Sequence, residues 1–359
     1  MGDDEKFMRL ALKLAAKGNP SPNPYVGAVI VKDGKVIGKG YHKKAGMAHA
    51  EVEALKSLEN LEDAKGATLY VTLEPCNHFG KTPPCTKAII EAGISKVVYG
   101  MKDPNPEVKG DGADELRKAG LEVVGGVLED EAAKQNEIFF KYCKTGLPFV
   151  LVKVAMSMDG KIATRIGDSK WISGEKARRY GHRLRSSCDA VLVGINTVLK
   201  DDPLLTARIS GGRNPVKIVL DGGLRIPLET KLLKEGKTLI ATCANANVEK
   251  KGELEKKGAT IILCGQERVD LKVLLAELGK IGITSVLVEG GSEVQGSFLD
   301  EGLLDKAVLI YAPILMGGRE AKTAFGGKGA EIVEQALKMR IEKVRKLGND
   351  FVFECYPIR

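Results

Sequence analysis

Three residues with the chemistry of metal ligands lie in the first quarter of the chain, each beside the expected end of a helix or strand. His49 lies at the start of one expected helix, Cys76 follows an expected strand, and Cys85 opens the next helix. One imidazole and two thiolates supply three ligands for zinc and leave one coordination position for water. Zinc lowers the pKa of such a bound water toward neutrality, so the pattern favours a hydrolytic enzyme.

Glu51 follows His49 by two residues, and we expect it to shuttle protons rather than bind the metal. A His-x-Glu segment followed by Pro-Cys and a second Cys is typical of zinc nucleobase deaminases. Eight residues separate Cys76 from Cys85, whereas the common deaminase signature has two. Taken singly, these residues could be a surface histidine and small buried thiols. A non-catalytic zinc module is a rival interpretation, for which His78 is the nearby candidate fourth ligand.

The elements that must position these residues alternate between helix and strand patterns. Residues 26–32 and 36–41 predict a β-hairpin around Asp33-Gly34, and a strand is expected at 67–73. Helices are expected at 48–58 and 86–92, and one uninterrupted helix over 129–144. Strands separated by helices predict an α/β layer with a partly parallel sheet.

A second α/β series begins after Thr145-Gly146-Leu147-Pro148, so we expect two domains, 1–146 and 147–359. Its sequence ends in an expected hairpin over 339–347 and 351–356, with the turn at Gly348-Asn349. Gly290 and Gly291 follow a buried strand and precede a helix start, which suits phosphate binding, although a turn without ligand explains them equally well. A G-x-G-x-x-G segment is absent, so a Rossmann dehydrogenase is not indicated.

Composition narrows the class of protein further. The net charge is +8, but the basic residues are interleaved with acidic ones along the sequence. Aromatic residues are only 5% of the chain, and both features disfavour nucleic-acid binding. No apolar run is long enough to span a membrane. The acidic first residues predict no secretory signal, and seven scattered cysteines favour a reducing compartment, so we expect a cytoplasmic protein.

The insert between the two cysteines carries a family resemblance. The segment EPCNHFGKTPPC at 74–85, PNPYVG at 22–27 and DPNP at 103–106 closely resemble the bifunctional riboflavin-biosynthesis deaminase–reductases, and the similarity covers essentially the whole chain. It implies an α/β fold with a cytidine-deaminase-like α/β/α domain followed by a dihydrofolate-reductase-like domain. The implied reactions are hydrolysis of the 2-amino group of 2,5-diamino-6-(5-phosphoribosylamino)pyrimidin-4(3H)-one and NADPH-dependent reduction of its ribosyl group to ribityl.

The resemblance also implies roles for residues of the first domain. His49, Cys76 and Cys85 match the zinc ligands, and Glu51 matches the catalytic proton donor and acceptor. Asn23 matches a pyrimidine-contacting asparagine, although an Asx turn between two prolines would also explain it. The family often has His where this chain has Glu53, and Arg where it has Lys81. Lys81 would meet the ribose phosphate as a point charge, or is simply a solvated loop lysine.

In the second domain the resemblance implies an NADPH site and a substrate site. The matching NADPH positions are Ala155, Trp171, Thr197, Asp201, Gly291, Ser292, Glu293, Val294, Gln295, Gly296 and Ser297. The matching substrate positions are Ser169, Arg185, Leu205, Arg208 and Glu289, and Lys153 lies near a charged group at the reacting sugar.

Ordinary explanations exist for several of these positions. A lone tryptophan such as Trp171 is more often a core residue than a ligand contact. Arginine binds phosphate bidentately, although Arg185 or Arg208 alone could be a surface ion pair. The resemblance further implies a homo-oligomer, a dimer or tetramer, through the reductase domain. The alternative function is a zinc deaminase that acts on nucleic acid through a C-terminal binding module.

Overall fold

The computed structural model describes residues 2–78, 83–105 and 111–358. The chain divides into two compact units, Met1–Gly146 and Leu147–Arg359. Each unit has its own sheet and its own hydrophobic core. Lys81 lies outside the described residues, so its contact with the ribose phosphate stays a prediction.

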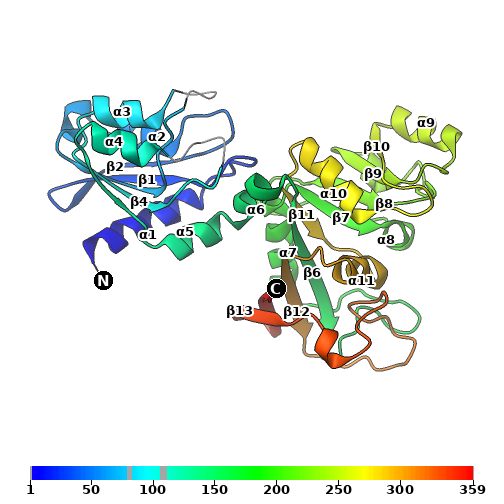
Figure 1. The fold of residues 1–359 in the computed structure, drawn as a ribbon. Coiled ribbons are helices and arrows are strands. Elements are labelled where there is room, and N and C mark those ends of the chain that lie inside the picture. The colour runs from blue at the N-terminus through cyan, green and yellow to red at the C-terminus, as the bar shows by residue number, and fades with distance from the viewer. Residues whose placement is uncertain (1, 79–82, 106–110, 359) are drawn as a thin grey trace. The chain divides into compact units, whose positions relative to one another are not determined.

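The first unit is a mixed sheet covered by helices on both faces (Figure 1). The strand order is β2-β1-β3-β4-β5, with β1 antiparallel to β2 and β3, and β3, β4 and β5 parallel. The strands are β1 (Gly27–Lys32), β2 (Lys35–Tyr41), β3 (Thr68–Leu73), β4 (Lys96–Met101) and β5 (Glu122–Gly125). The helices are α1 (Asp3–Ala15), α2 (Ala50–Lys56), α3 (Cys85–Glu91), α4 (Gly112–Lys118), α5 (Glu129–Gln135) and α6 (Glu137–Thr145), with a 3-10 turn η1 (Leu61–Ala64).

Local sequence accounts for much of this unit. The predicted hairpin turn is confirmed, because Asp33 and Gly34 both have positive φ (50° and 71°), as a tight two-residue hairpin turn requires. Figure 1 shows α1 and α5 on one face of the sheet and α2, α3 and α4 on the other. Core side chains such as Met8 and Ile89 lie fully buried between these layers. The starts of α2 and α3 therefore lie on the same face of the sheet.

The expectation of one helix over 129–144 is wrong, because the chain leaves helical geometry at Asn136 (φ −108°, ψ 18°). The side chain of Asn136 is buried and bonds the backbone of Tyr25 twice. Its Nδ2 donates to the Tyr25 carbonyl at 3.0 Å, and its Oδ1 accepts from the Tyr25 amide at 2.7 Å. This clamp holds the segment that carries Asn23 and separates α5 from α6.

The second unit contains a long, mostly parallel sheet in the order β10-β9-β8-β7-β11-β6-β12-β14-β13. Only the β12–β14 and β14–β13 pairs are antiparallel among its described strands. The strands are β6 (Phe149–Ser157), β7 (Ala190–Gly194), β8 (Val216–Leu220), β9 (Thr238–Thr242), β10 (Ala259–Leu263), β11 (Ser285–Val288), β12 (Lys306–Ala312), β13 (Met339–Leu347) and β14 (Asp350–Pro357).

Helices and 3-10 turns connect these strands. They are α7 (Glu175–Ser187), α8 (Ile195–Asp201), η2 (Lys231–Leu233), α9 (Val248–Lys256), α10 (Leu271–Lys280), α11 (Ser292–Asp300) and η3 (Val333–Gln335). The predicted closing hairpin is confirmed as β13–β14, and Gly348 adopts the positive φ that its turn needs. Because β11 inserts between β7 and β6, the strand order reverses there, which is where ligand crevices form in open α/β sheets.

None of the helices in the described part of the chain combines the length and the apolar character that a membrane crossing needs.

Candidate active sites

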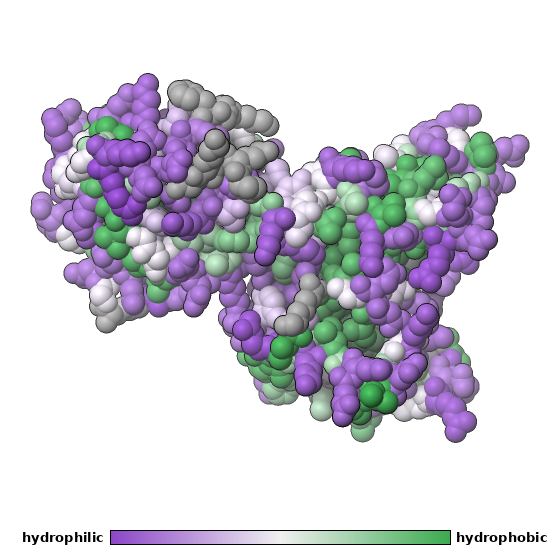
Figure 2. Space-filling model, viewed as in Figure 1, coloured by the Kyte–Doolittle hydropathy of each residue, from purple (hydrophilic) through white to green (hydrophobic). Residues whose placement is uncertain are grey.

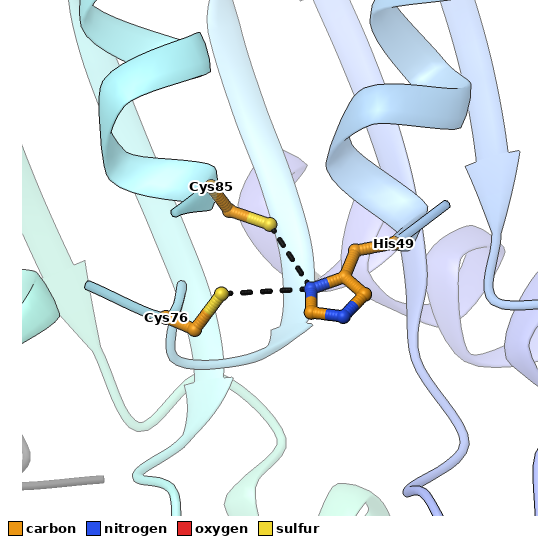
Figure 3. A group of neighbouring side chains, drawn as sticks. All are labelled: His49, Cys76 and Cys85. Atoms are coloured by element: carbon orange, nitrogen blue, oxygen red, sulfur yellow. Dashed lines mark hydrogen bonds between the residues drawn. The ribbon is translucent and has the colours of Figure 1, made fainter. Parts of the chain in front are cut away.

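The three predicted metal ligands lie together in the first unit. The ligand atoms of His49, Cys76 and Cys85 are all within 4.8 Å of one another. Nδ1 of His49 is 3.3 Å from Sγ of Cys85 and 3.5 Å from Sγ of Cys76, and Figure 3 shows both sulfurs pointing at this nitrogen. Ligands on a tetrahedral zinc with bonds of about 2.0–2.3 Å lie roughly 3.5 Å apart, so this donor set fits zinc.

Element ends bring these side chains together. His49 is the N-cap residue of α2, Cys85 is the first residue of α3, and Cys76 follows β3 after Glu74-Pro75. α2 and α3 also contact each other on one face of the sheet. His78, the candidate fourth ligand of a structural site, is exposed and is not part of the ligand cluster found among the described residues.

The thiols of Cys76 and Cys85 have pKa values shifted in opposite directions. Hydrogen bonds from Cys85 and from His49 to Cys76 lower the pKa of the Cys76 thiol. The bond to Cys76, together with burial, raises the pKa of the Cys85 thiol. A cation at this position would replace the shared proton and favour both thiolates, because thiolates are the metal-binding form of cysteine.

Glu51 lies in the first turn of α2 and is 4% exposed. Burial raises the pKa of its carboxyl to about 7, and the negative charge of Cys76 adds to the effect. Glu51 also interacts with Cys85, so the carboxyl faces the ligand cluster. A carboxyl with a pKa near neutrality can both accept and donate a proton, which suits general acid–base chemistry.

His42 lies beside the cluster, although sequence reasoning gave it no role. Its Nδ1 donates to the Ala48 carbonyl at 3.0 Å, because a carbonyl can only accept. Its Nε2 therefore accepts from Nδ2 of Asn23, also at 3.0 Å. The ring packs edge-on against His49, with centroids 5.4 Å apart. His42 thus fixes which end of the Asn23 amide remains available to a ligand.

Two further acidic residues border this region. Glu53, where the family often has histidine, forms an ion pair with Lys43. Burial raises the pKa of Asp103 to about 6, and the negative charges of Glu74 and Cys76 add to it. Asp103 belongs to the segment that supports the family resemblance, but its electrostatic link to the cluster depends on tertiary structure.

The second unit has a cavity of about 670 Å³ at the carboxyl ends of β6, β7, β8 and β11. Most of the predicted reductase residues line it: Lys153, Ala155, Ser169, Trp171, Arg185, Thr197, Asp201, Arg208, Glu289 and Gly291 to Gln295. Leu205, Gly296 and Ser297 are not among its lining residues. Gly296 packs instead against the backbone of Gly326, where an added Cβ would lie 2.2 Å from the carbonyl oxygen.

The cavity has the features of a dinucleotide site. A Cβ built on Gly291 meets no atom within 4 Å, so the backbone before α11 borders open space. Amide groups at the start of α11 can then approach a phosphate. The lining also includes Arg178, His182 and Asn196, to which the sequence analysis assigned no role.

Arg185 and Glu289 form a bidentate pair inside this cavity. Nε and Nη2 of Arg185 donate to the two Glu289 oxygens at 2.9 and 2.7 Å. Burial opposes ionisation of Glu289, but the charges of Arg185 and Lys153 prevail and lower its pKa to about 2. The Arg185 fork is thus occupied by a carboxylate, while Arg208 is exposed at the cavity.

Comparisons with known proteins agree with a metal site in the first unit and a dinucleotide cavity in the second. The family model for the cytidine and deoxycytidylate deaminase zinc-binding region matches residues 1–101, and that for the RibD C-terminal domain matches residues 148–353. The riboflavin biosynthesis protein RibD of Aquifex aeolicus is 47% identical, over 97% of both chains. RibD of Actinobacillus pleuropneumoniae is 45% identical over 99% of this chain and 96% of that protein. The chain belongs to the RibD family.

A solved structure supports the same relationship. It is a diaminohydroxyphosphoribosylaminopyrimidine deaminase/5-amino-6-(5-phosphoribosylamino)uracil reductase from Thermotoga maritima, 40% identical, with a TM-score of 0.90 and 99% of each chain covered. The family resemblance, the deaminase-like and reductase folds and the bifunctional role in riboflavin biosynthesis are thereby confirmed. Zinc and NADPH are the cofactors, and the substrates are small molecules. The nucleic-acid deaminase alternative is not favoured.

Proposed function

We propose that residues 1–146 carry the deaminase site and residues 147–359 the reductase site. The first site removes the 2-amino group of 2,5-diamino-6-(5-phosphoribosylamino)pyrimidin-4(3H)-one. The second reduces the ribosyl group of the deaminated compound and gives 5-amino-6-(5-phosphoribitylamino)uracil. The observation that carries this proposal is the three-donor cluster of His49, Cys76 and Cys85 beside the buried carboxyl of Glu51.

In the deaminase unit, His49, Cys76 and Cys85 would hold the metal. Zinc, when bound, would act as a Lewis acid that lowers the pKa of the attacking water. Glu51 takes a proton from the attacking water and delivers it to the departing amino group, so a C–O bond forms, a C–N bond breaks and ammonia leaves. The amide nitrogen of Asn23 donates its hydrogen bond to His42. The amide oxygen of Asn23 is therefore the atom that would accept a hydrogen bond from an N–H of the pyrimidine.

In the reductase unit, the start of α11 and the residues after β6 and β7 would hold NADPH, the hydride donor. We propose that Arg208 anchors the substrate phosphate, since its guanidinium is exposed at the cavity. Arg185 would orient Glu289 toward the substrate instead of binding phosphate itself. Lys153 lies beside α7 at the cavity, because a Cβ added to Gly181 would be in ordinary contact with its Nζ, at 3.9 Å.

We further propose a homo-oligomer that forms through the reductase unit. β13 is the edge strand of its sheet, and Ile341 and Val344 on it are more than half exposed (57% and 51%). Figure 2 shows hydrophobic residues on the surface at the position of β13. Light scattering coupled to gel filtration tests this, and a monomeric protein would contradict it. None of the cysteines in the described part of the chain forms a disulfide bond, which supports the proposal of a reducing, cytoplasmic location.

The proposed reactions are tested by supplying the diaminopyrimidine phosphoriboside and following ammonia release together with NADPH absorbance. Ammonia should appear with or without NADPH, and NADPH should be consumed only after deamination has begun. NADPH consumption that precedes ammonia release would contradict the proposed order. Release of ammonia that survives complete removal of zinc would contradict the proposed deaminase site.

A further inference from the structure

A large and exposed indole borders the reductase cavity. Trp171 is the single tryptophan of the sequence, lines the cavity and is 68% exposed. Burial normally restricts an aromatic ring, and a ring this exposed retains much of its side-chain freedom. A side chain that forms a wall of a binding site must therefore be held by some contact other than core packing.

Arg178, in the first turn of α7, supplies such a contact. Its guanidinium carbon lies 4.7 Å from the centroid of the Trp171 ring, within the range of a cation–π interaction. Arg178 is itself fixed, because its Nη1 donates a 2.6 Å hydrogen bond to the carbonyl of Ser173. Ser173 is buried, so the arginine is bound to a part of the chain that is packed into the fold.

The backbone around Trp171 is anchored on both sides. The amide of Gly174 donates to Oδ2 of Asp350 at 2.8 Å, and Asp350 is only 2% exposed. On the other side, the backbone amide of Lys170 donates to Oδ1 of Asp168 at 3.3 Å. The freedom that remains is rotation of the indole about its own side-chain bonds, and Arg178 restricts that rotation.

We propose that Arg178 is a positioning residue that holds the Trp171 indole as a wall of the cavity, ready to stack on a flat ring of bound NADPH. The idea rests on the proposed function, in which this cavity takes NADPH. Arginine suits this task better than lysine, because a planar guanidinium stacks on an aromatic face, whereas an ammonium acts as a point charge. Arg178 acts through Trp171 and does not need to touch the cofactor.

The single tryptophan makes the proposal measurable in the full-length enzyme. Arg178→Ala and Arg178→Lys are compared with Arg179→Ala, a matched control at the next position of the helix, where the side chain is exposed. Fluorescence anisotropy of Trp171 reports the mobility of the indole without ligand. Energy transfer from Trp171 to NADPH gives the dissociation constant of the cofactor, and steady-state kinetics separate KM from kcat.

We expect Arg178→Ala to lower the anisotropy of Trp171 and to raise the dissociation constant and KM for NADPH about two- to five-fold, the scale of an exposed cation–π contact. The kcat and the melting temperature should stay close to those of the wild type. Arg178→Lys should fall between wild type and Arg178→Ala, and Arg179→Ala should match the wild type.

Two results would overturn the proposal. One is an anisotropy in Arg178→Ala and Arg178→Lys equal to that of Arg179→Ala, because the indole would then be held without Arg178. The other is a lower anisotropy with an unchanged dissociation constant for NADPH. A wild-type enzyme with neither energy transfer nor thermal stabilisation by NADPH would contradict the proposed function instead, and the anisotropy comparison would still decide the role of Arg178.

Discussion

The buried ion pair of the reductase cavity makes a quantitative prediction about stability. Glu289 and Arg185 are bound through two hydrogen bonds, and their side chains are 9% and 15% exposed. The pKa of Glu289 falls from its ordinary value of 4.5 to about 2. At about 1.4 kcal/mol for each pKa unit, ionised Glu289 contributes about 3 kcal/mol to the free energy of unfolding.

The perturbation is Glu289→Gln, which keeps the shape of the side chain and leaves Arg185 buried without its counter-charge. For a unit of this size, about 3 kcal/mol corresponds to a fall of roughly 6–12 °C in melting temperature near neutral pH. If the two units unfold separately, calorimetry on the full chain should show two unfolding transitions, and only that of the second unit should move to lower temperature. Glu229→Gln is the matched control, because Glu229 pairs with Lys257 on the surface of the same unit, and its effect should be small.

The pH dependence gives the sharper test. Because folding lowers the pKa of Glu289, its contribution is present above about pH 4.5 and is lost as the pH falls toward about 2. Wild type and Glu289→Gln should therefore differ most near neutrality, differ less as the pH falls below about 4.5, and converge only at about pH 2. A difference that stays constant over this range, or that never exceeds the effect of Glu229→Gln, would contradict a stabilising role of the Arg185–Glu289 pair.

Three further changes have separable outcomes. Glu51→Gln should keep stoichiometric zinc but lose about 10²–10⁴-fold in deamination rate, measured as ammonia release, while reduction of the deaminated compound continues; retained deamination would remove Glu51 from its role. Asn136→Ala should raise the KM of deamination and lower the melting temperature of the first unit, because the amide and carbonyl of Tyr25 lose their partners; unchanged values for both would contradict the clamp. Arg208→Ala should raise the KM of reduction about tenfold or more and leave deamination intact, since a charged hydrogen bond to phosphate is lost; equal damage to both reactions would indicate misfolding instead.

The deaminase cluster was predictable because its signal is local. His49, Cys76 and Cys85 each lie at an element end, and hydrophobic periodicity places those ends well enough to bring three residue types together. The hairpin at Asp33-Gly34 was predictable for the same reason, since two adjacent residues suited to positive φ define the turn.

Other features arise from contacts between distant segments and leave no local pattern. The helix break at Asn136 is stabilised by bonds to Tyr25, more than a hundred residues earlier in the chain. Helix α9 was not expected, because its sequence is mostly charged and contains Gly252. Helix α8 was not expected either, because it is only two turns long and gives too short a hydrophobic pattern.

The reductase site shows the same limit. Most of the reductase residues implied by the resemblance do line the cavity, but the resemblance did not show that the Arg185 guanidinium is already paired with Glu289. Arg178 had no sequence signal either, since its contact with Trp171 depends on how the segment before α7 folds back on the helix. The sequence shows that these arginines are present, but which side chain each of them contacts depends on tertiary structure.

The proposed deaminase mechanism requires that zinc be held by three side chains of the first unit. X-ray absorption spectroscopy on the zinc-loaded enzyme measures the donor set directly. We predict two sulfur donors, one imidazole nitrogen and one light donor that exchanges with solvent. Four donors from the protein, with none that exchanges, would contradict the deaminase mechanism.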